Sequence, residues 1–247
     1  MPSKNNFLIS KKNTVWFIKN TTTEGPGYFA PLLQRWKIPF QICDLQKGDK
    51  LPAPRKKDAV IVLGGPMSAN DQTPSMLMLL KWIRLQLKRK TPYLGICLGL
   101  QTLVKSAGGK VVKSPVKEIG LKHRQRPYVC LLTRKGEKDT LFTGFKKSFS
   151  IFHLHSETVV LKPSMDLIAE GEECLNQIVK VTSQAYGIQG HLEMTTKLLS
   201  EWLETDDDLR REDSKKMLRE WQRVKKELNG NCRKILLNFL KMAGIIR

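Results

Sequence analysis

Short apolar runs rich in β-branched residues alternate with amphipathic segments through the first hundred residues. Residues 27–36 and 74–90 carry apolar side chains at helical spacing, the second between Pro74 and Pro92. The apolar runs around them predict four buried strands, at 13–18, 39–45, 58–65 and 91–97. Strands that alternate with helices predict a parallel sheet covered by helices on both faces. We therefore expect an α/β fold with an open, twisted and mostly parallel sheet.

The pattern changes after a helix that begins near Leu100 and ends at Gly108 and Gly109. Short apolar runs follow one another closely and predict strands at 110–114, 128–134, 148–156, 158–162, 166–172 and 176–183. Such spacing leaves little room for crossover helices. It predicts a mixed or antiparallel extension of the sheet.

From about Thr195 the chain is predicted to be helical and charged. Three helices are expected, over 195–205, 215–228 and 231–245, with Asn229 and Gly230 separating the last two. The apolar residues of the last helix form one stripe: Cys232, Ile235, Leu236, Phe239 and Leu240. Packing of this stripe on the domain is favoured over contact with a partner subunit, which would include a homodimer. We expect a domain over residues 1–200 and a helical extension over 201–247 packed on it.

Composition limits the class of protein further. The net charge is +20, from 43 Lys and Arg against 23 Asp and Glu, and the basic residues are scattered without a long run. A solvated basic surface is favoured over attraction to an acidic partner, and nucleic-acid binding is disfavoured. Five cysteines without a C-x-x-C pair argue against disulfides and a zinc site. With no membrane-length apolar run and no secretory signal in residues 1–20, a cytoplasmic, membrane-free protein is expected.

A glycine-flanked cysteine stands where a predicted strand meets a predicted helix. Gly95 and Gly99 enclose Cys97 as G-x-C-x-G, the arrangement of a nucleophile elbow. A helix N-terminus favours a thiolate, and the backbone amide of Leu98 would face a developing oxyanion. The alternative is a small buried cysteine in a glycine-rich turn. A nucleophile is favoured over that alternative.

A base for this cysteine is suggested by the short H-x-E sequence of His191 and Glu193. In an extended segment residues i and i+2 project to the same side, so the carboxylate can orient the imidazole. Alone, this pair would be two solvated surface residues. A second glycine turn, Gly64 and Gly65, ends the predicted strand at 58–65 and could bring another backbone amide to a substrate oxygen.

Three motifs in this order, VLGGPMS at 62–68, YLGICLGLQ at 93–101 and YGIQGHLE at 186–193, resemble the class I glutamine amidotransferase family. The resemblance is closest to stand-alone members similar to the glutaminase part of GMP synthase, and it covers roughly residues 14–200. It implies the flavodoxin-like fold of that family. It also implies hydrolysis of the side-chain amide of L-glutamine to glutamate and ammonia, and transfer of the ammonia to a synthase subunit or domain. No metal or organic cofactor is implied.

The resemblance also assigns roles to residues of this sequence. Cys97 would form the γ-glutamyl thioester, His191 would act as base and acid, and Glu193 would orient it. The backbone amides of Gly65 and Leu98 would form the oxyanion hole. Substrate contacts would come from Gln101 and from the segment that contains His153, His155 and Ser156.

Two departures from the family pattern stand near these residues. Gly190 and Leu192 replace the usual aromatic residue before the histidine and proline after it, so a looser backbone beside His191 is expected. In FHLHSET, Ser156 and Glu157 replace the glycine and aspartate of H-x-H-G-D, and a structural role for His153 is equally open. Two further hypotheses remain: a γ-glutamyl peptidase or hydrolase on the same fold, and a catalytically weak subunit that binds a partner.

Overall fold

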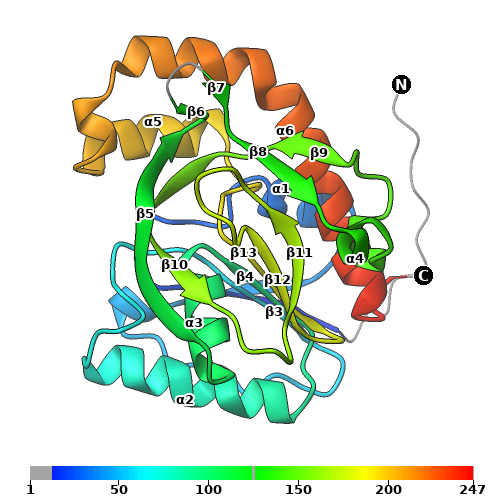
Figure 1. Ribbon diagram of the computed structural model, residues 1–247. Helices are drawn as coiled ribbons and strands as arrows, with labels where there is room; N and C mark the ends of the chain where they lie inside the picture. Colours follow the sequence, from blue (N-terminus) through cyan, green and yellow to red (C-terminus); the bar gives the residue numbers. More distant parts are fainter. Residues whose placement is uncertain (1–12, 124–125, 247) are drawn as a thin grey trace.

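The described residues, 13–123 and 126–246 of this computed structural model, form a nine-stranded mixed sheet between helices (Figure 1). Its strands are parallel through one half and antiparallel through the other. In spatial order they are β2 (Phe40–Asp44), β1 (Val15–Lys19), β3 (Ala59–Val62), β4 (Tyr93–Ile96), β13 (Ala185–Ile188), β12 (Ile178–Thr182), β11 (Asp166–Glu170), β8 (Val129–Leu132) and β9 (Ser148–Ser150). The first five are parallel, so the expected parallel sheet with an antiparallel extension is confirmed.

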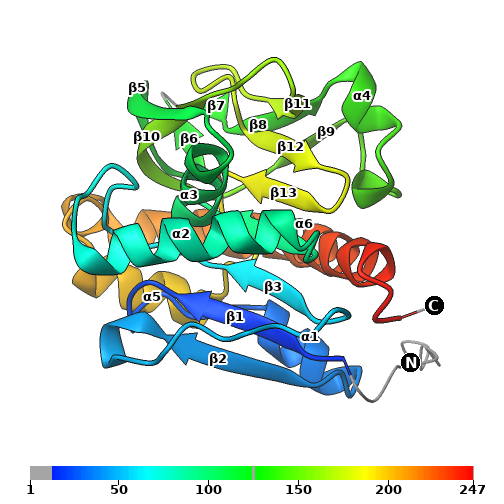
Figure 2. The ribbon, with the colours of Figure 1, turned by 90° about the horizontal axis from the view of Figure 1, so that it is seen from below.

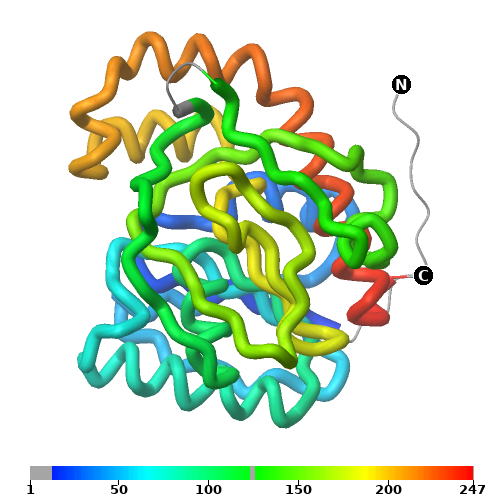
Figure 3. The backbone as a smooth tube through the Cα atoms, in the orientation of Figure 1, coloured from blue at the N-terminus to red at the C-terminus, as the bar shows by residue number. Residues whose placement is uncertain are grey.

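The centre of the sheet is occupied by a strand from late in the chain. β13 pairs in parallel with β4 and antiparallel with β12, and so joins the two halves. Figure 3 shows this late segment, in yellow, running through the middle of the molecule. The carboxyl ends of β3, β4 and β13 therefore meet at one edge of the sheet, where ligands of parallel α/β sheets bind.

A two-stranded antiparallel ribbon lies beside the large sheet and corrects part of the sequence prediction. It consists of β5 (Lys110–Gly120) and β10 (His153–Val160). The single strand predicted at 148–156 is divided, because the chain leaves the large sheet after β9 and joins β5 two residues later. Ile151 and Phe152 at this junction are both fully buried, which breaks strand alternation. β6 (Lys122–His123) and β7 (Arg126–Pro127) form a further short pair.

Two buried apolar clusters lie on opposite faces of the sheet. One contains the buried sides of α1 (Phe29–Arg35), α5 (Thr196–Thr205) and α6 (Ser214–Met242), and the other those of α2 (Pro74–Lys88) and α3 (Leu98–Ser106). Figures 1 and 2 show these two layers, with α2 and α3 on the side opposite α5 and α6. The remaining helical turns are η1 (Leu45–Lys47), α4 (Arg134–Glu137), η2 (Thr140–Phe142) and η3 (Leu209–Arg211).

The two helices predicted after residue 214 form one continuous helix, α6. Asn229 and Gly230 look like a stop in the sequence, but both are helical here. The apolar stripe from Cys232 to Leu240 is buried in the same cluster as α1 and the sheet, and this packing outweighs the low helix propensity of Gly230. The stripe therefore packs within this chain.

Among the described residues, none of the helices is both long and apolar enough to span a bilayer. The first twelve residues belong to the expected domain and to the segment in which we predict no secretory signal. They lie outside the described residues.

Candidate active site

The G-x-C-x-G motif forms a tight turn between β4 and α3. Cys97 has φ of +51°, in a region that non-glycine residues rarely adopt, and its amide donates to the carbonyl of Ile188 on β13 at 2.8 Å. A Cβ on Gly95 would lie 2.3 Å from the carbonyl oxygen of Gly99, and one on Gly99 would lie 2.1 Å from that of Val62. Both flanking glycines are therefore required by close backbone contacts.

The thiol of Cys97 reaches a cavity of about 510 Å³ although the residue is only 7% exposed. It lies 3.7 Å from the carbonyl oxygen of Leu154, to which it can donate. The side-chain amide of Gln189 donates to the sulfur, also at 3.7 Å. Gln189 follows the end of β13, and sequence reasoning missed it. Its place two residues before His191, at the carboxyl end of a parallel strand, was the available signal.

His191 and Glu193 are buried beside this thiol. Nδ1 of His191 lies 2.7 Å from Oε1 of Glu193, so the carboxylate accepts a proton that Nδ1 carries. Burial alone would lower the pKa of His191. The negative charge of Glu193 and a hydrogen bond with Cys97 outweigh burial and raise this pKa well above its usual value. The structure thus brings Cys97, His191 and Glu193 into one chain of interactions.

The segment around Gly190 is tightly packed, contrary to the looser backbone expected there. A Cβ on Gly190 would lie 2.8 Å from the side chain of Ile151 and from the carbonyl oxygen of Phe152. The amide of His191 donates to that same carbonyl at 2.7 Å. On the other side, the ring of Trp202 from α5 meets the imidazole edge to face, with centroids 4.9 Å apart. Neighbouring side chains therefore hold His191 in place without an aromatic residue at 190.

Gly65 and Leu98 lie next to each other at this edge of the sheet. Gly65 lines the cavity with Cys97, and a Cβ on it would be 3.1 Å from the side chain of Leu98. The Gly64–Gly65 turn is held by Asn20, whose buried amide donates to the carbonyls of Leu63 and Gly64. Asn20 directly follows β1, and it is a second residue that sequence reasoning missed.

The predicted substrate residues fall into two groups. Gln101, His155 and Ser156 line the cavity of Cys97. Gln101 donates to the backbone carbonyl of Glu157 at 3.2 Å, and its amide is 3.5 Å from that of Gln189. His153, by contrast, lines a different cavity on the other side of β10.

Acidic residues that no sequence motif indicated also line this cavity. Glu24 approaches His191, and its pKa is raised to about 7 because burial penalises the carboxylate more than the charge of His191 favours it. Three aspartates after α5, Asp206, Asp207 and Asp208, line the same cavity. Asp208 forms an ion pair with Lys117 of β5, so the segment after α5 closes one side of the site.

Comparison with known proteins shows the family of this chain. The family model described as Glutamine amidotransferase class-I matches residues 36–206. The chain belongs to this family. A glutamine amidotransferase of Thermotoga maritima has a similar structure, with a TM-score of 0.82 and 26% identity over 93% of this chain and 97% of that one.

Two relatives show how much of each protein the sequence similarity covers. The glutamine amidotransferase-like protein YfeJ of Salmonella typhimurium is 28% identical over 74% of this chain and 77% of its own length. The glutamine-hydrolyzing GMP synthase of Porphyromonas gingivalis is 31% identical over 66% of this chain, but over only 31% of its own length. This chain therefore matches less than a third of that synthase.

Proposed function

We propose that this protein is a glutaminase that hydrolyses the side-chain amide of L-glutamine through Cys97. The observation that supports this most strongly is the shared cavity of Cys97, at a strained strand-to-helix turn, and His191, whose Nδ1 is 2.7 Å from the Glu193 carboxylate. It is the nucleophile, base and orienter arrangement of covalent acyl transfer. Membership of the class I glutamine amidotransferases supports the same substrate.

In the proposed mechanism Nε2 of His191 takes the thiol proton, and the thiolate attacks the amide carbon of glutamine. The backbone amides of Gly65 and Leu98 stabilise the negative oxygen of the tetrahedral intermediate. His191 returns the proton to the departing nitrogen, so ammonia leaves and a γ-glutamyl thioester remains on Cys97. Water, deprotonated by His191, attacks this thioester and releases glutamate. Glu193 stabilises the imidazolium at both stages, and Gln101 and Ser156 contact the substrate. The imidazole of His155 does not, because Glu118 and the carbonyl of Glu157 take both of its nitrogens.

The ammonia is proposed to pass to a synthase subunit, as in a GMP-synthase-like system. Support comes from the similarity to the glutamine-hydrolyzing GMP synthase of Porphyromonas gingivalis, of which this chain matches 31% of the length. Co-purification with a synthase, and a rise in glutaminase rate when that synthase is added, would test this part separately.

The direct test measures glutamate and ammonia released from glutamine by the purified chain. Cys97→Ala should abolish both products, and a glutamine-analogue electrophile should label the wild type but not this variant. Cys43→Ala is the matched control, because Cys43 lies on β2 and is absent from the residues that line the cavity. Full turnover by Cys97→Ala would refute the assignment.

A second candidate, a γ-glutamyl peptidase or hydrolase, is favoured by the size of the cavity. Its volume of about 510 Å³ falls in the range of sites that bind drug-sized ligands. The cavity is therefore larger than glutamine alone requires. The same thioester would form, with an amine larger than ammonia as the leaving group. Comparing kcat/KM for glutamine and for γ-glutamyl dipeptides distinguishes the two functions.

A further inference from the structure

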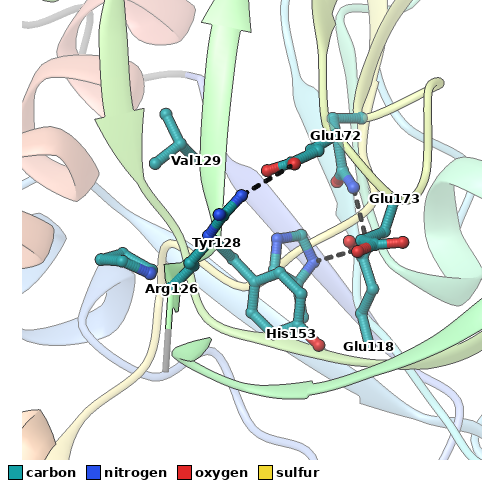
Figure 4. A pocket seen from close by; sticks show the side chains of 9 residues that line it. Glu118, Arg126, Tyr128, Val129, His153, Glu172 and Glu173 are labelled. Carbon is teal, nitrogen blue, oxygen red and sulfur yellow. Dashed lines mark hydrogen bonds and ion pairs between the residues drawn. The ribbon is translucent and has the colours of Figure 1, made fainter. Parts of the chain in front are cut away.

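A second buried group of ionisable side chains lies on the β5–β10 ribbon, across β10 from the cavity of Cys97. Glu118 of β5 stands opposite His155 of β10 in the strand register, and His153 is two residues before His155. Residues i and i+2 of a strand share a face, so all three side chains project together. Figure 4 shows His153 and Glu118 directed toward one another in the cavity that they line.

The three side chains offer one ligand atom each within 4.8 Å of one another. Oε2 of Glu118 is 2.7 Å from Nε2 of His155 and 3.5 Å from Nδ1 of His153. The side chains are only 1–2% exposed. The same oxygen accepts from the amide of Gln177 at 2.8 Å. A carboxylate oxygen and two imidazole nitrogens therefore lie close together in a site almost completely shielded from solvent.

Hydrogen bonds within the described part of the chain do not satisfy every polar atom of this group. Nδ1 of His153 is buried and has no hydrogen-bond partner there. Nδ1 of His155 lies 3.1 Å from the backbone carbonyl of Glu157, which can only accept, so this nitrogen carries a proton. In a neutral His155 the lone pair of Nε2 then faces the carboxylate oxygen of Glu118. A positive centre, either a second proton or a metal ion, is needed between them.

We propose that Glu118, His153 and His155 bind a first-row transition-metal ion of the Zn²⁺ type. Two imidazoles and one carboxylate are a ligand set that Zn²⁺ uses, with a fourth position left for water. The bond of Nδ1 of His155 to a carbonyl directs Nε2 at the ion, as such outer contacts do in metal sites. Tetrahedral bonds of about 2.0 Å place ligand atoms about 3.3 Å apart. The Glu118–His153 distance fits this, and Glu118 and His155 must separate by about half an ångström.

The site adjoins a cavity separate from that of Cys97. Glu118, His153 and Gln177 line a cavity of about 440 Å³. Arg126 and Glu172 also line it, both largely exposed, and form an ion pair of 3.8 Å (Figure 4). An ion at this place would tie β10 to β5. Because the carbonyl of Leu154 on β10 lies 3.7 Å from the thiol of Cys97, the ion would also stabilise one wall of the proposed active site.

The test uses Cys97→Ala as background, since the thiol of Cys97 beside His191 could itself bind Zn²⁺. The metal-free full chain should bind one equivalent of Zn²⁺ in competition with a chelating indicator, and its Tm should rise. His153→Asn and Glu118→Gln should each weaken the apparent Kd by about a hundredfold or more. Glu172→Gln is the control that should keep wild-type affinity, because Glu172 lines the same cavity but is exposed and lies outside the ligand group.

A spectroscopic measurement does not depend on the folding of those variants. Co²⁺ bound in the Cys97→Ala chain should show d–d absorption without a thiolate-to-metal charge-transfer band. A thiolate band would place the ion on another cysteine and overturn the proposal. So would the lack of a bound Zn²⁺ equivalent, which would leave a proton between His155 and Glu118, or an equivalent that both ligand variants retain. None of these results depends on whether the protein hydrolyses glutamine.

Discussion

Two buried histidine–carboxylate pairs with the same 2.7 Å separation stand on the two sides of β10. In one, Nδ1 of His191 meets Glu193, and the other nitrogen is free to meet the thiol of Cys97. In the other, Nε2 of His155 meets Glu118, and Nδ1 is taken by the backbone carbonyl of Glu157. The two histidines differ in their second ring nitrogen. Nε2 of His191 is free to exchange a proton with the thiol, whereas Nδ1 of His155 is bonded to the backbone, so His155 only holds β5 and β10 together.

Replacing each histidine is the strongest test of the difference between the two pairs. His191→Asn is expected to lower glutaminase kcat/KM of the folded protein by about 10⁴ or more, because the thiol loses its base. Each of the two substitutions leaves a buried carboxylate without its partner, so each should cost about 3–5 kcal/mol of unfolding free energy. His155→Asn, however, should keep the turnover of the protein that remains folded. Steady-state assays and urea unfolding in chelator-treated buffer measure both. The comparison fails if His155→Asn abolishes turnover in a protein of unchanged stability.

Exchanging the carboxylates for amides gives a smaller effect of the same kind. Glu193→Gln should reduce kcat by about a hundredfold to a thousandfold with KM nearly unchanged, since the imidazolium loses its counter-charge. Glu118→Gln should leave kcat within a few-fold of wild type and lower the unfolding free energy by about 1–3 kcal/mol. A larger loss of kcat in Glu118→Gln than in Glu193→Gln would reverse the roles assigned to the two pairs.

The sequence allowed the parallel half of the fold and the residues at its edge to be predicted, because both follow from local patterns. Strand runs, glycine turns and H-x-E are each readable within ten residues. The ribbon could not be predicted, since periodicity does not say to which sheet residues 148–160 belong. Glu118 was missed for the same reason: its partners stand 35 and 37 positions away, and only the β5–β10 register brings them together. The cysteine pattern that argued against zinc carries no information about such a histidine–carboxylate group.

A third prediction concerns the tight packing that positions His191. Gly190→Ala should lower the unfolding free energy by about 1–3 kcal/mol, because its Cβ would meet Ile151 and Phe152 at 2.8 Å. Gly230→Ala in α6 is the matched control. A Cβ there meets nothing within 4 Å, so this change should stabilise the protein by about 0.5–1 kcal/mol. Equal effects of the two substitutions in thermal unfolding would show that Gly190 is not closely packed.

The smallest expected effect comes from Glu24, an ionisable neighbour of His191. Burial raises the pKa of Glu24 to about 7 in the folded protein, from 4.5. Its contribution to stability is therefore fully present below about pH 4.5 and is lost as the pH rises through 7. Glu24→Gln should match the wild type in Tm near pH 5 and exceed it near pH 8.5. A Tm difference that does not change between these two pH values would contradict the raised pKa.

The central position of β13 has a consequence for how the protein acquires its native state. β13 supplies the carbonyl that fixes the amide of Cys97, leads directly into Gln189 and His191, and joins the two halves of the sheet. Its partner β4 precedes it by about ninety residues, and such long-range pairing is slow. Until β13 pairs with β4, the chain can hold neither the strained turn nor the base. The thiol of Cys97 should therefore become reactive in the same step that completes the sheet. A partly folded chain would expose no activated cysteine.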